Sequence, residues 1–233
     1  MEVDAEVRRA AGDATAAHRE TLVRRLHDAA ASYQRHRDAD ALRLAKSVAR
    51  EVPSVAAVHE VAGLAAYRSG QWREAIRQLE THFAMTDEVA DLPMLMDAQR
   101  AVGKHKKVAD LWGELRRRSP EPGVLAEARI VAAGSLADRG DLDGAISLLA
   151  AAGAAKARRN PSERHLRQWY ALADLYERAG DFTRARELFL LVARADPDAY
   201  DVADRLEALG PARRRPRSRT RGAPPARRTS GTG

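Results

Sequence analysis

Apolar and polar residues follow one another along this chain with the period of an α-helix. Apolar residues recur three or four positions apart over short segments rich in alanine, leucine, arginine and glutamate. Isolated glycines and prolines separate the segments, and no segment has the strict alternation typical of a strand. The pattern predicts an all-α protein built from short helices that are joined by tight turns.

Four glycines mark turns at a regular spacing. Gly70, Gly103, Gly140 and Gly180 follow one another at intervals of 33, 37 and 40 residues. Prolines at 53, 120 and 197 fall where a second helix of each unit is expected to end, because proline lacks the backbone donor and clashes with the preceding turn. Spacing of this length predicts stacked helical hairpins, with insertions in some copies.

The sharpest copy of the repeat begins at Leu166. Its signature positions are Trp169, Leu172, Ala173, Tyr176, Gly180, Ala185, Phe189 and Pro197. This copy resembles the tetratricopeptide repeat (TPR), whose 34-residue pattern is W-x-x-L-G-x-x-Y, then A-x-x-x-F, then P. Residues 56–88 form a second good copy, residues 89–125 and 126–165 are weaker copies, and residues 22–55 are either a weak repeat or a cap. We therefore expect a TPR-type α-solenoid of about five hairpins.

The packing logic of the hairpins follows from small residues at facing positions. Gly63 with Ala75, and Ala173 with Ala185, are expected to let the two helices of one hairpin approach closely. Pro93 is compatible with a helix only if that helix starts near Asp91. Aromatic residues are expected to fill the space between hairpins.

Three regions are predicted. Residues 1–21 form a polar extension, which is either a frayed helix or disordered, with little burial in the core. Residues 22–210 form the repeat domain, which ends in a capping helix at 200–209 with an apolar stripe that includes Tyr200. Residues 211–233 are rich in arginine and proline without apolar periodicity, so we expect a disordered tail.

The resemblance implies a concave groove lined by the first helix of each hairpin. It assigns repeat positions 5, 9, 12 and 13 to the groove, a set that here mixes both charges with three tyrosines, and tyrosine with arginine often anchors interfaces. The residues at these positions are Leu26, Tyr33, Glu60, Leu64, Tyr67, Arg68, Asp97, Arg100, Ile130, Tyr170, Asp174, Glu177 and Arg178. These residues form either a partner-binding groove or the solvated inner face of a structural spacer.

The residues of this chain exclude one TPR subtype. The members that clamp a chaperone's C-terminal carboxylate have lysine and asparagine where this chain has Leu26 and Ala30. We therefore expect the groove to bind a different segment, extended or helical, of an unidentified partner protein.

The positive charge of the chain is concentrated in the tail. The chain carries 40 Lys and Arg against 33 Asp and Glu, a net charge of +7, and removing the eight tail arginines leaves 32 basic residues and a net charge of −1. The eight are Arg213, Arg214, Arg215, Arg217, Arg219, Arg221, Arg227 and Arg228. Arginine at this density contacts phosphates independently of sequence, so an alternative function is a nucleic-acid- or ribosome-associated adaptor that uses the tail to bind RNA, DNA or another polyanion.

Candidate chemistry is otherwise sparse. The chain has no cysteine and none of the common nucleotide, zinc-protease or hydrolase motifs, and its seven histidines are dispersed. We expect no enzyme activity, no cofactor and no metal. The acidic first residues do not resemble a secretory signal, and the apolar runs are shorter than a membrane span, so the expected location is the cytoplasm without membrane contact.

A further resemblance rests on three segments. Residues 58–72, 85–93 and 129–134 resemble a subgroup of TPR proteins of high-GC bacteria that carries no established activity. The preference for arginine over lysine agrees with such a genome. This resemblance implies a fold and no particular partner.

Overall fold

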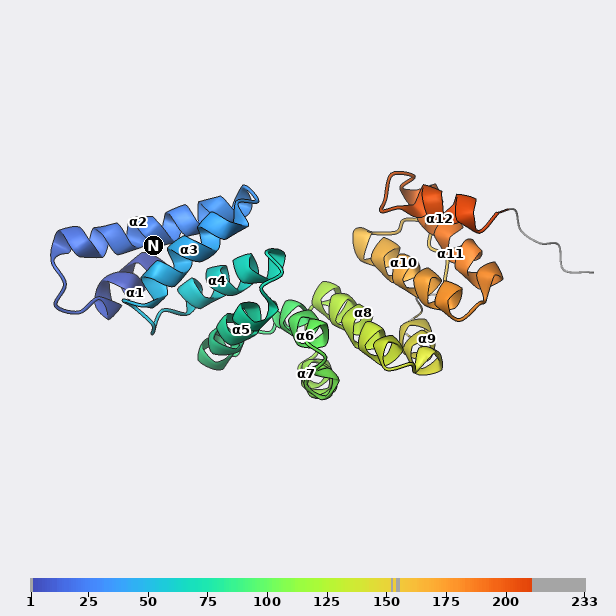
Figure 1. The fold of residues 1–233 in the computed structure, drawn as a ribbon, viewed down its shortest axis with the longest axis horizontal. Helices are drawn as coiled ribbons and strands as arrows, with labels where there is room; N and C mark the ends of the chain where they lie inside the picture. The colour runs from blue at the N-terminus through green and yellow to red at the C-terminus, as the bar shows by residue number, and fades with distance from the viewer. Residues whose placement is uncertain (1, 152, 154–155, 211–233) are drawn as a thin grey trace, which may run out of the picture.

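The computed structural model describes residues 2–151, 153 and 156–210, and every regular element in these residues is a helix (Figure 1). The twelve helices of this part of the chain are α1 (Glu2–Ala10), α2 (Ala16–Gln34), α3 (Asp38–Ala49), α4 (Ala56–Arg68), α5 (Trp72–Thr86), α6 (Leu92–Ala101), α7 (His105–Arg117), α8 (Pro122–Asp138), α9 (Leu142–Ala150), α10 (Glu163–Arg178), α11 (Phe182–Ala195) and α12 (Val202–Ala208). The predicted all-α class is confirmed.

Five consecutive hairpins, from α2–α3 to α10–α11, stack into a curved solenoid. Each first helix contacts the first helix of the next hairpin, from α2 through α4, α6 and α8 to α10. These helices line the inner side of the curve, whereas α5, α7 and α9 lie on the outer side (Figure 1). The predicted solenoid of five hairpins with a C-terminal capping helix is confirmed.

The hairpin turns explain why one copy of the repeat is hard to see in the sequence. Gly70, Gly103, Gly140 and Gly180 all have left-handed backbones, with φ between 68° and 87°, a conformation that costs glycine little. In the α2–α3 turn the same position is His36, with φ of 57°. Residues 22–55 therefore contain a true hairpin that lacks the glycine signal.

The N-terminal end of the solenoid begins earlier than the repeat register predicts. α2 starts at Ala16, because the side chain of Thr15 accepts a hydrogen bond from the backbone N–H of His18. Val7 on α1 is fully buried against a cluster that includes Leu22 and Leu26. The expectation that residues 1–21 bury little in the core is therefore wrong at Val7, which packs there together with Ala10 and Ala11 at the end of the same helix.

Close helix packing occurs where the small residues predicted it. A Cβ at Gly63 would lie 2.7 Å from Cγ and Cδ2 of Leu79, so α4 and α5 approach at this glycine. α6 begins at Leu92 with Asp91 as its N-cap residue, which confirms the late start that Pro93 requires. Both features restrict the positions of α4 and α6, the first helices of their hairpins. These helices carry part of the candidate site.

The C-terminal end is covered by α12. Val202 is buried, and Leu206 and Leu209 pack against the core of the fifth hairpin, as expected for a cap. Tyr200, however, precedes the helix with a left-handed φ of 56° and is 51% exposed, so its predicted place in the apolar stripe is wrong. The predicted disordered tail, 211–233, lies outside the described residues.

Candidate concave binding surface

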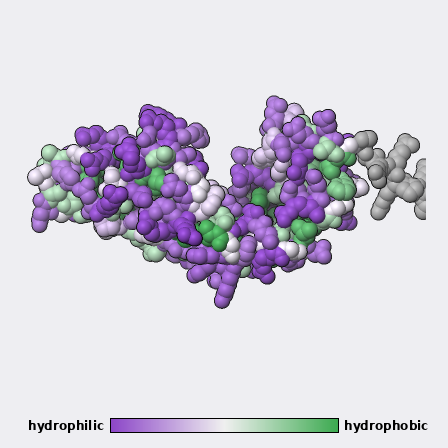
Figure 2. Space-filling model, viewed as in Figure 1, coloured by the Kyte–Doolittle hydropathy of each residue, from purple (hydrophilic) through white to green (hydrophobic). Residues whose placement is uncertain are grey.

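The inner side of the solenoid forms a broad concave surface. Figure 2 shows the molecule hollowed between its two ends, over α6 and α8, with hydrophilic residues around most of the hollow. The side chains that reach it come from α4, α6, α8 and α10, because these helices run side by side along the inner side. The surface is therefore assembled from several hairpins.

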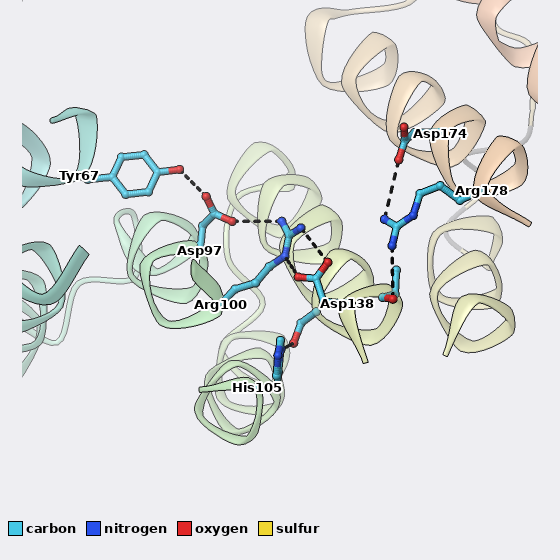
Figure 3. A network of polar contacts seen from close by, with 9 residues as sticks. Tyr67, Asp97, Arg100, His105, Asp138, Asp174 and Arg178 are labelled. Carbon is cyan, nitrogen blue, oxygen red and sulfur yellow. Dashed lines mark hydrogen bonds and ion pairs between the residues drawn. The ribbon is translucent and has the colours of Figure 1, made fainter. Parts of the chain in front are cut away.

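A chain of polar contacts crosses the middle of this surface (Figure 3). The Tyr67 hydroxyl donates to Asp97 Oδ2 at 2.8 Å, and Arg100 donates to Asp97 Oδ1 at 3.3 Å and to Asp138 Oδ2 at 2.6 Å. These contacts join the second, third and fourth hairpins. Gly134 on α8 makes room for this, because a Cβ there would lie 2.8 Å from the Arg100 guanidinium carbon.

A second group of contacts closes the C-terminal wall. Arg205 of α12 donates to Asp174 and lies 3.2 Å from Glu177, while Arg178 donates to the backbone carbonyl of Ala137 at 3.3 Å. These interactions fix α10 against both α8 and α12.

Tyrosines form the aromatic part of the same wall. The Tyr170 hydroxyl donates to Asp201, and the Tyr200 ring lies over the Tyr170 ring with 4.7 Å between centroids. Tyr200 exposes half of its surface, so its ring is accessible to a partner. The sequence had instead predicted that this ring belongs to the apolar stripe of the cap.

The N-terminal wall is built around Arg68. Its guanidinium carbon lies 3.6 Å from the Tyr33 ring centroid, one nitrogen donates to the Tyr33 carbonyl at 2.9 Å, and Asp38 lies 3.6 Å away. Arg68 therefore ties the first hairpin to the second.

Burial and pairing shift the acid–base behaviour of several groups. Burial, with the Asp97 hydrogen bond, raises the pKa of Tyr67, and burial with the Asp201 hydrogen bond raises the pKa of Tyr170 to about 12. Burial also raises the pKa of Glu60, with the Asp91 carboxylate as a further cause. The tyrosines therefore remain neutral hydrogen-bond donors at neutral pH.

The structure brings most of the predicted groove residues together. Those that take part in the contacts above are Tyr33, Tyr67, Arg68, Asp97, Arg100, Tyr170, Asp174, Glu177 and Arg178. Glu60, Leu64 and Ile130 stay half-buried. Leu26 is buried, 6% exposed, because α1 and α2 pack there, so its predicted place in the groove is wrong.

Several members of the surface were not predicted from the sequence. Asp138 lies eight residues after Ile130, the offset that relates Glu60 to Arg68, so the repeat register could have identified it. Arg167 pairs with Glu127 at 2.8 Å. Both residues occupy position 2 of their repeats, a position that the TPR resemblance does not assign to the groove. Asp201 and Arg205 belong to the cap, and no pattern in the sequence indicated that they reach the surface.

The described residues hold no cluster of three or more histidine or acidic side chains placed to bind a metal ion. Among the helices that the structure describes, none is long and apolar enough to cross a membrane. The candidate site therefore consists of hydrogen-bonding, charged and aromatic groups.

Comparisons with known proteins support the fold. No protein-family model matches the sequence, and no curated protein does. A thermophilic TPR protein of Thermus thermophilus, TTC0263, is 18% identical and superposes with a TM-score of 0.63 over 81% of this chain and 98% of that one. YrrB, described as a TPR protein with an unusual peptide-binding site, is 20% identical, with a TM-score of 0.51 over 77% of this chain and 89% of that one. The chain therefore has the TPR fold, and the resemblance to high-GC bacterial proteins stays a prediction.

Acidification provides a test of the central network. The hydrogen bond from Arg100 lowers the pKa of Asp138, so this carboxylate stabilises the fold above its unfolded pKa and loses that contribution as pH falls below about 4. Arg100→Met is expected to raise the pKa of Asp138 toward its ordinary value and to reduce the stability lost on acidification. Carboxyl-carbon NMR titration measures the shift.

The matched control is Arg73→Met, since Arg73 lies on the exposed side of α5. Its replacement should leave the Asp138 titration unchanged. An unchanged titration in Arg100→Met would show that the pair does not form in solution.

Proposed function

We propose that the protein is a non-catalytic scaffold that binds a segment of a partner protein on its concave surface. The observation that supports this most directly is the set of contacts that link inner side chains across successive hairpins. Arg68, Arg100 and Arg205 each join two elements before any partner arrives. A surface held in this way loses little conformational entropy on binding.

The type of partner is also proposed on the basis of the fold. A solved TPR structure that superposes on this chain is described as having a peptide-binding site, which supports a protein or peptide partner here. We also propose that the protein acts in the cytoplasm, a location compatible with a chain that needs no disulfide. The alternative, a nucleic-acid- or ribosome-associated adaptor that uses the tail, rests on residues outside the described part and stays a prediction from the sequence.

Position-specific photo-cross-linking tests the proposal. We expect a photoreactive phenylalanine analogue in place of Tyr200, on the concave surface, to cross-link a discrete partner in cells. The same analogue in place of Phe182, an aromatic residue at the α10–α11 turn, is the control, since it exposes 57% of its surface beside Ala208 and Gly210 at the end of the cap. Equal cross-linking from both positions, or from Phe182 alone, would contradict a concave binding surface.

Substitution provides the second arm. Tyr200→Ala is expected to weaken capture of the partner by about 1 to 2 kcal/mol, or roughly 5- to 30-fold, as for an aromatic interface anchor. Phe182→Ala should leave capture unchanged. If Tyr200→Ala also leaves it unchanged, Tyr200 is not an anchor and the aromatic wall is only structural.

A further inference from the structure

The charges on the concave surface are unequal. Among the described residues that build this surface and its two walls, five arginines face nine carboxylates. The arginines are Arg68, Arg100, Arg167, Arg178 and Arg205, and the carboxylates are Asp38, Glu60, Asp91, Asp97, Glu127, Asp138, Asp174, Glu177 and Asp201. The surface therefore carries an excess of negative charge.

Pairing within the fold leaves only negative charge uncommitted. Each of the five arginines already lies within 4 Å of a carboxylate oxygen, at distances from 2.5 to 3.9 Å. Glu60 has no ion pair or hydrogen bond from a described side chain, whereas Asp91 lies 3.9 Å from His82, a pair that carries opposite charges only when His82 is protonated. A ligand that completes this surface must therefore bring cations.

Glu60 and Asp91 are also partly shielded from water. Burial raises the pKa of both Glu60 and Asp91, so each is costly to keep charged without a partner. The Tyr33 hydroxyl shares this region, since burial and, to a smaller extent, both carboxylates raise the pKa of Tyr33. An incoming guanidinium would meet carboxylates and an aromatic hydroxyl together.

The chain itself contains a segment with the complementary chemistry. Residues 211–233 hold eight arginines and no acidic residue, whereas the rest of the chain has a net charge of −1. The segment follows Gly210 directly after α12, and α12 already places Arg205 in the concave surface. Twenty-three residues reach at most about 80 Å when extended. Packed helices lie about 10 Å apart, so the three steps from α10 through α8 and α6 to α4 need only about 30 Å.

We propose that the arginine-rich segment 211–233 binds the concave surface of its own chain, with its guanidinium groups against Glu60, Asp91 and the central carboxylates. This inference rests on the proposed function, because it assigns the first occupant of the same surface. A partner segment then has to displace the tail. A polyanion that captures the tail would free the surface.

Paramagnetic relaxation in the full-length protein tests the proposal. The chain has no cysteine, so Ser218→Cys provides one attachment site for a nitroxide label. We expect the label to attenuate the amide signals of α4 and α6 on the inner side at about 50 mM salt, and the signals to recover at about 0.5 M salt, where charges are screened beyond roughly 4 Å. Signals of α7 and α9, on the outer side, should change little.

Charge-matched variants identify the contact. Glu60→Gln combined with Asp91→Asn is expected to remove the attenuation. Asp110→Asn combined with Asp143→Asn changes the net charge by the same amount at exposed sites on α7 and α9, and should leave it intact. Attenuation that is absent, that spreads equally over both sides, or that survives the Glu60 and Asp91 substitutions would overturn the proposal.

Two further outcomes separate the alternatives. The proposal is overturned if a nitroxide-labelled copy attenuates the inner amides of a separate isotope-labelled copy as strongly as its own, since the contact is then between copies. It is also overturned if the tail binds short single-stranded RNA and the inner amides are not attenuated in its absence. Partner cross-linking from position 200 reports on the scaffold function independently. If cross-linking persists while attenuation is absent, the scaffold function stands and tail binding fails; attenuation without any cross-linked partner means the reverse.

Discussion

Replacing Phe189 by alanine is expected to lower the free energy of unfolding by about 4 kcal/mol, since deletion of a buried phenylalanine removes apolar contacts and leaves a cavity. The Phe189 side chain is fully buried in the fifth hairpin. Its ring meets the Tyr170 ring edge-on with 5.4 Å between centroids, and the Arg205 guanidinium lies 5.3 Å from it. Loss of Phe189 therefore loosens both the C-terminal core and one wall of the concave surface.

Phe182→Ala is the matched control, because Phe182 begins the same helix and is 57% exposed. It should change the free energy of unfolding by less than about 0.5 kcal/mol. Urea unfolding followed by circular dichroism gives the global values, and hydrogen exchange of α10–α12 gives the local ones. Equal effects of the two substitutions would mean that the fifth hairpin is not packed around Phe189.

Gly63→Val is expected to destabilise the protein by about 3 kcal/mol, because overpacking forces either side-chain strain or backbone separation. A Cβ at this position would lie 2.7 Å from two Leu79 side-chain atoms and 3.2 Å from the Leu79 backbone nitrogen. Since backbone is among the nearest atoms, a rotamer change in Leu79 alone cannot relieve the contact. The axes of α4 and α5 would move apart and displace Tyr67 from Asp97.

Gly113→Ala in α7 is the control for this substitution. The nearest atom to a Cβ there is the Arg117 guanidinium, at 3.7 Å, which is ordinary contact. Alanine should therefore raise the free energy of unfolding by about 0.5 to 1 kcal/mol, the usual gain over glycine inside a helix. Thermal unfolding of both variants measures the difference, and a neutral Gly63→Val would show that the α4–α5 approach is not tight.

The Gly63 contact also shows which features of helix packing the repeat pattern predicts and which it does not. The small residues at Gly63 and Ala75 predicted close packing of one hairpin, and the structure confirms it. The atom in the way is nevertheless Leu79 rather than Ala75, because side chains on a helix extend toward the preceding turn and cover a neighbour of their own position. Periodicity predicts which faces meet, and only coordinates show which atoms touch.

The amino-acid sequence alone was sufficient for the class of fold, the five hairpins, the late start of α6 and the cap, because each depends on local periodicity, turn glycines and prolines. The first hairpin was uncertain because His36 takes the left-handed turn position with a side chain that does not signal it. Val7 and Tyr200 were misjudged because periodicity does not show which apolar stripes find a packing partner: Val7 of the short α1 is buried beside Ala10 and Ala11, whereas α12 begins only two residues after Tyr200.

The candidate surface depended more on tertiary structure. The repeat register located Tyr67, Asp97 and Arg100, but the carboxylate that completes their network, Asp138, comes from another hairpin 38 residues later than Arg100. The curvature and stacking of the hairpins decide which arginines form ion pairs and which carboxylates do not. Both depend on contacts between residues that are distant in the chain, and only these contacts show that Glu60 has no ion pair whereas Asp91 has His82 as a neighbour.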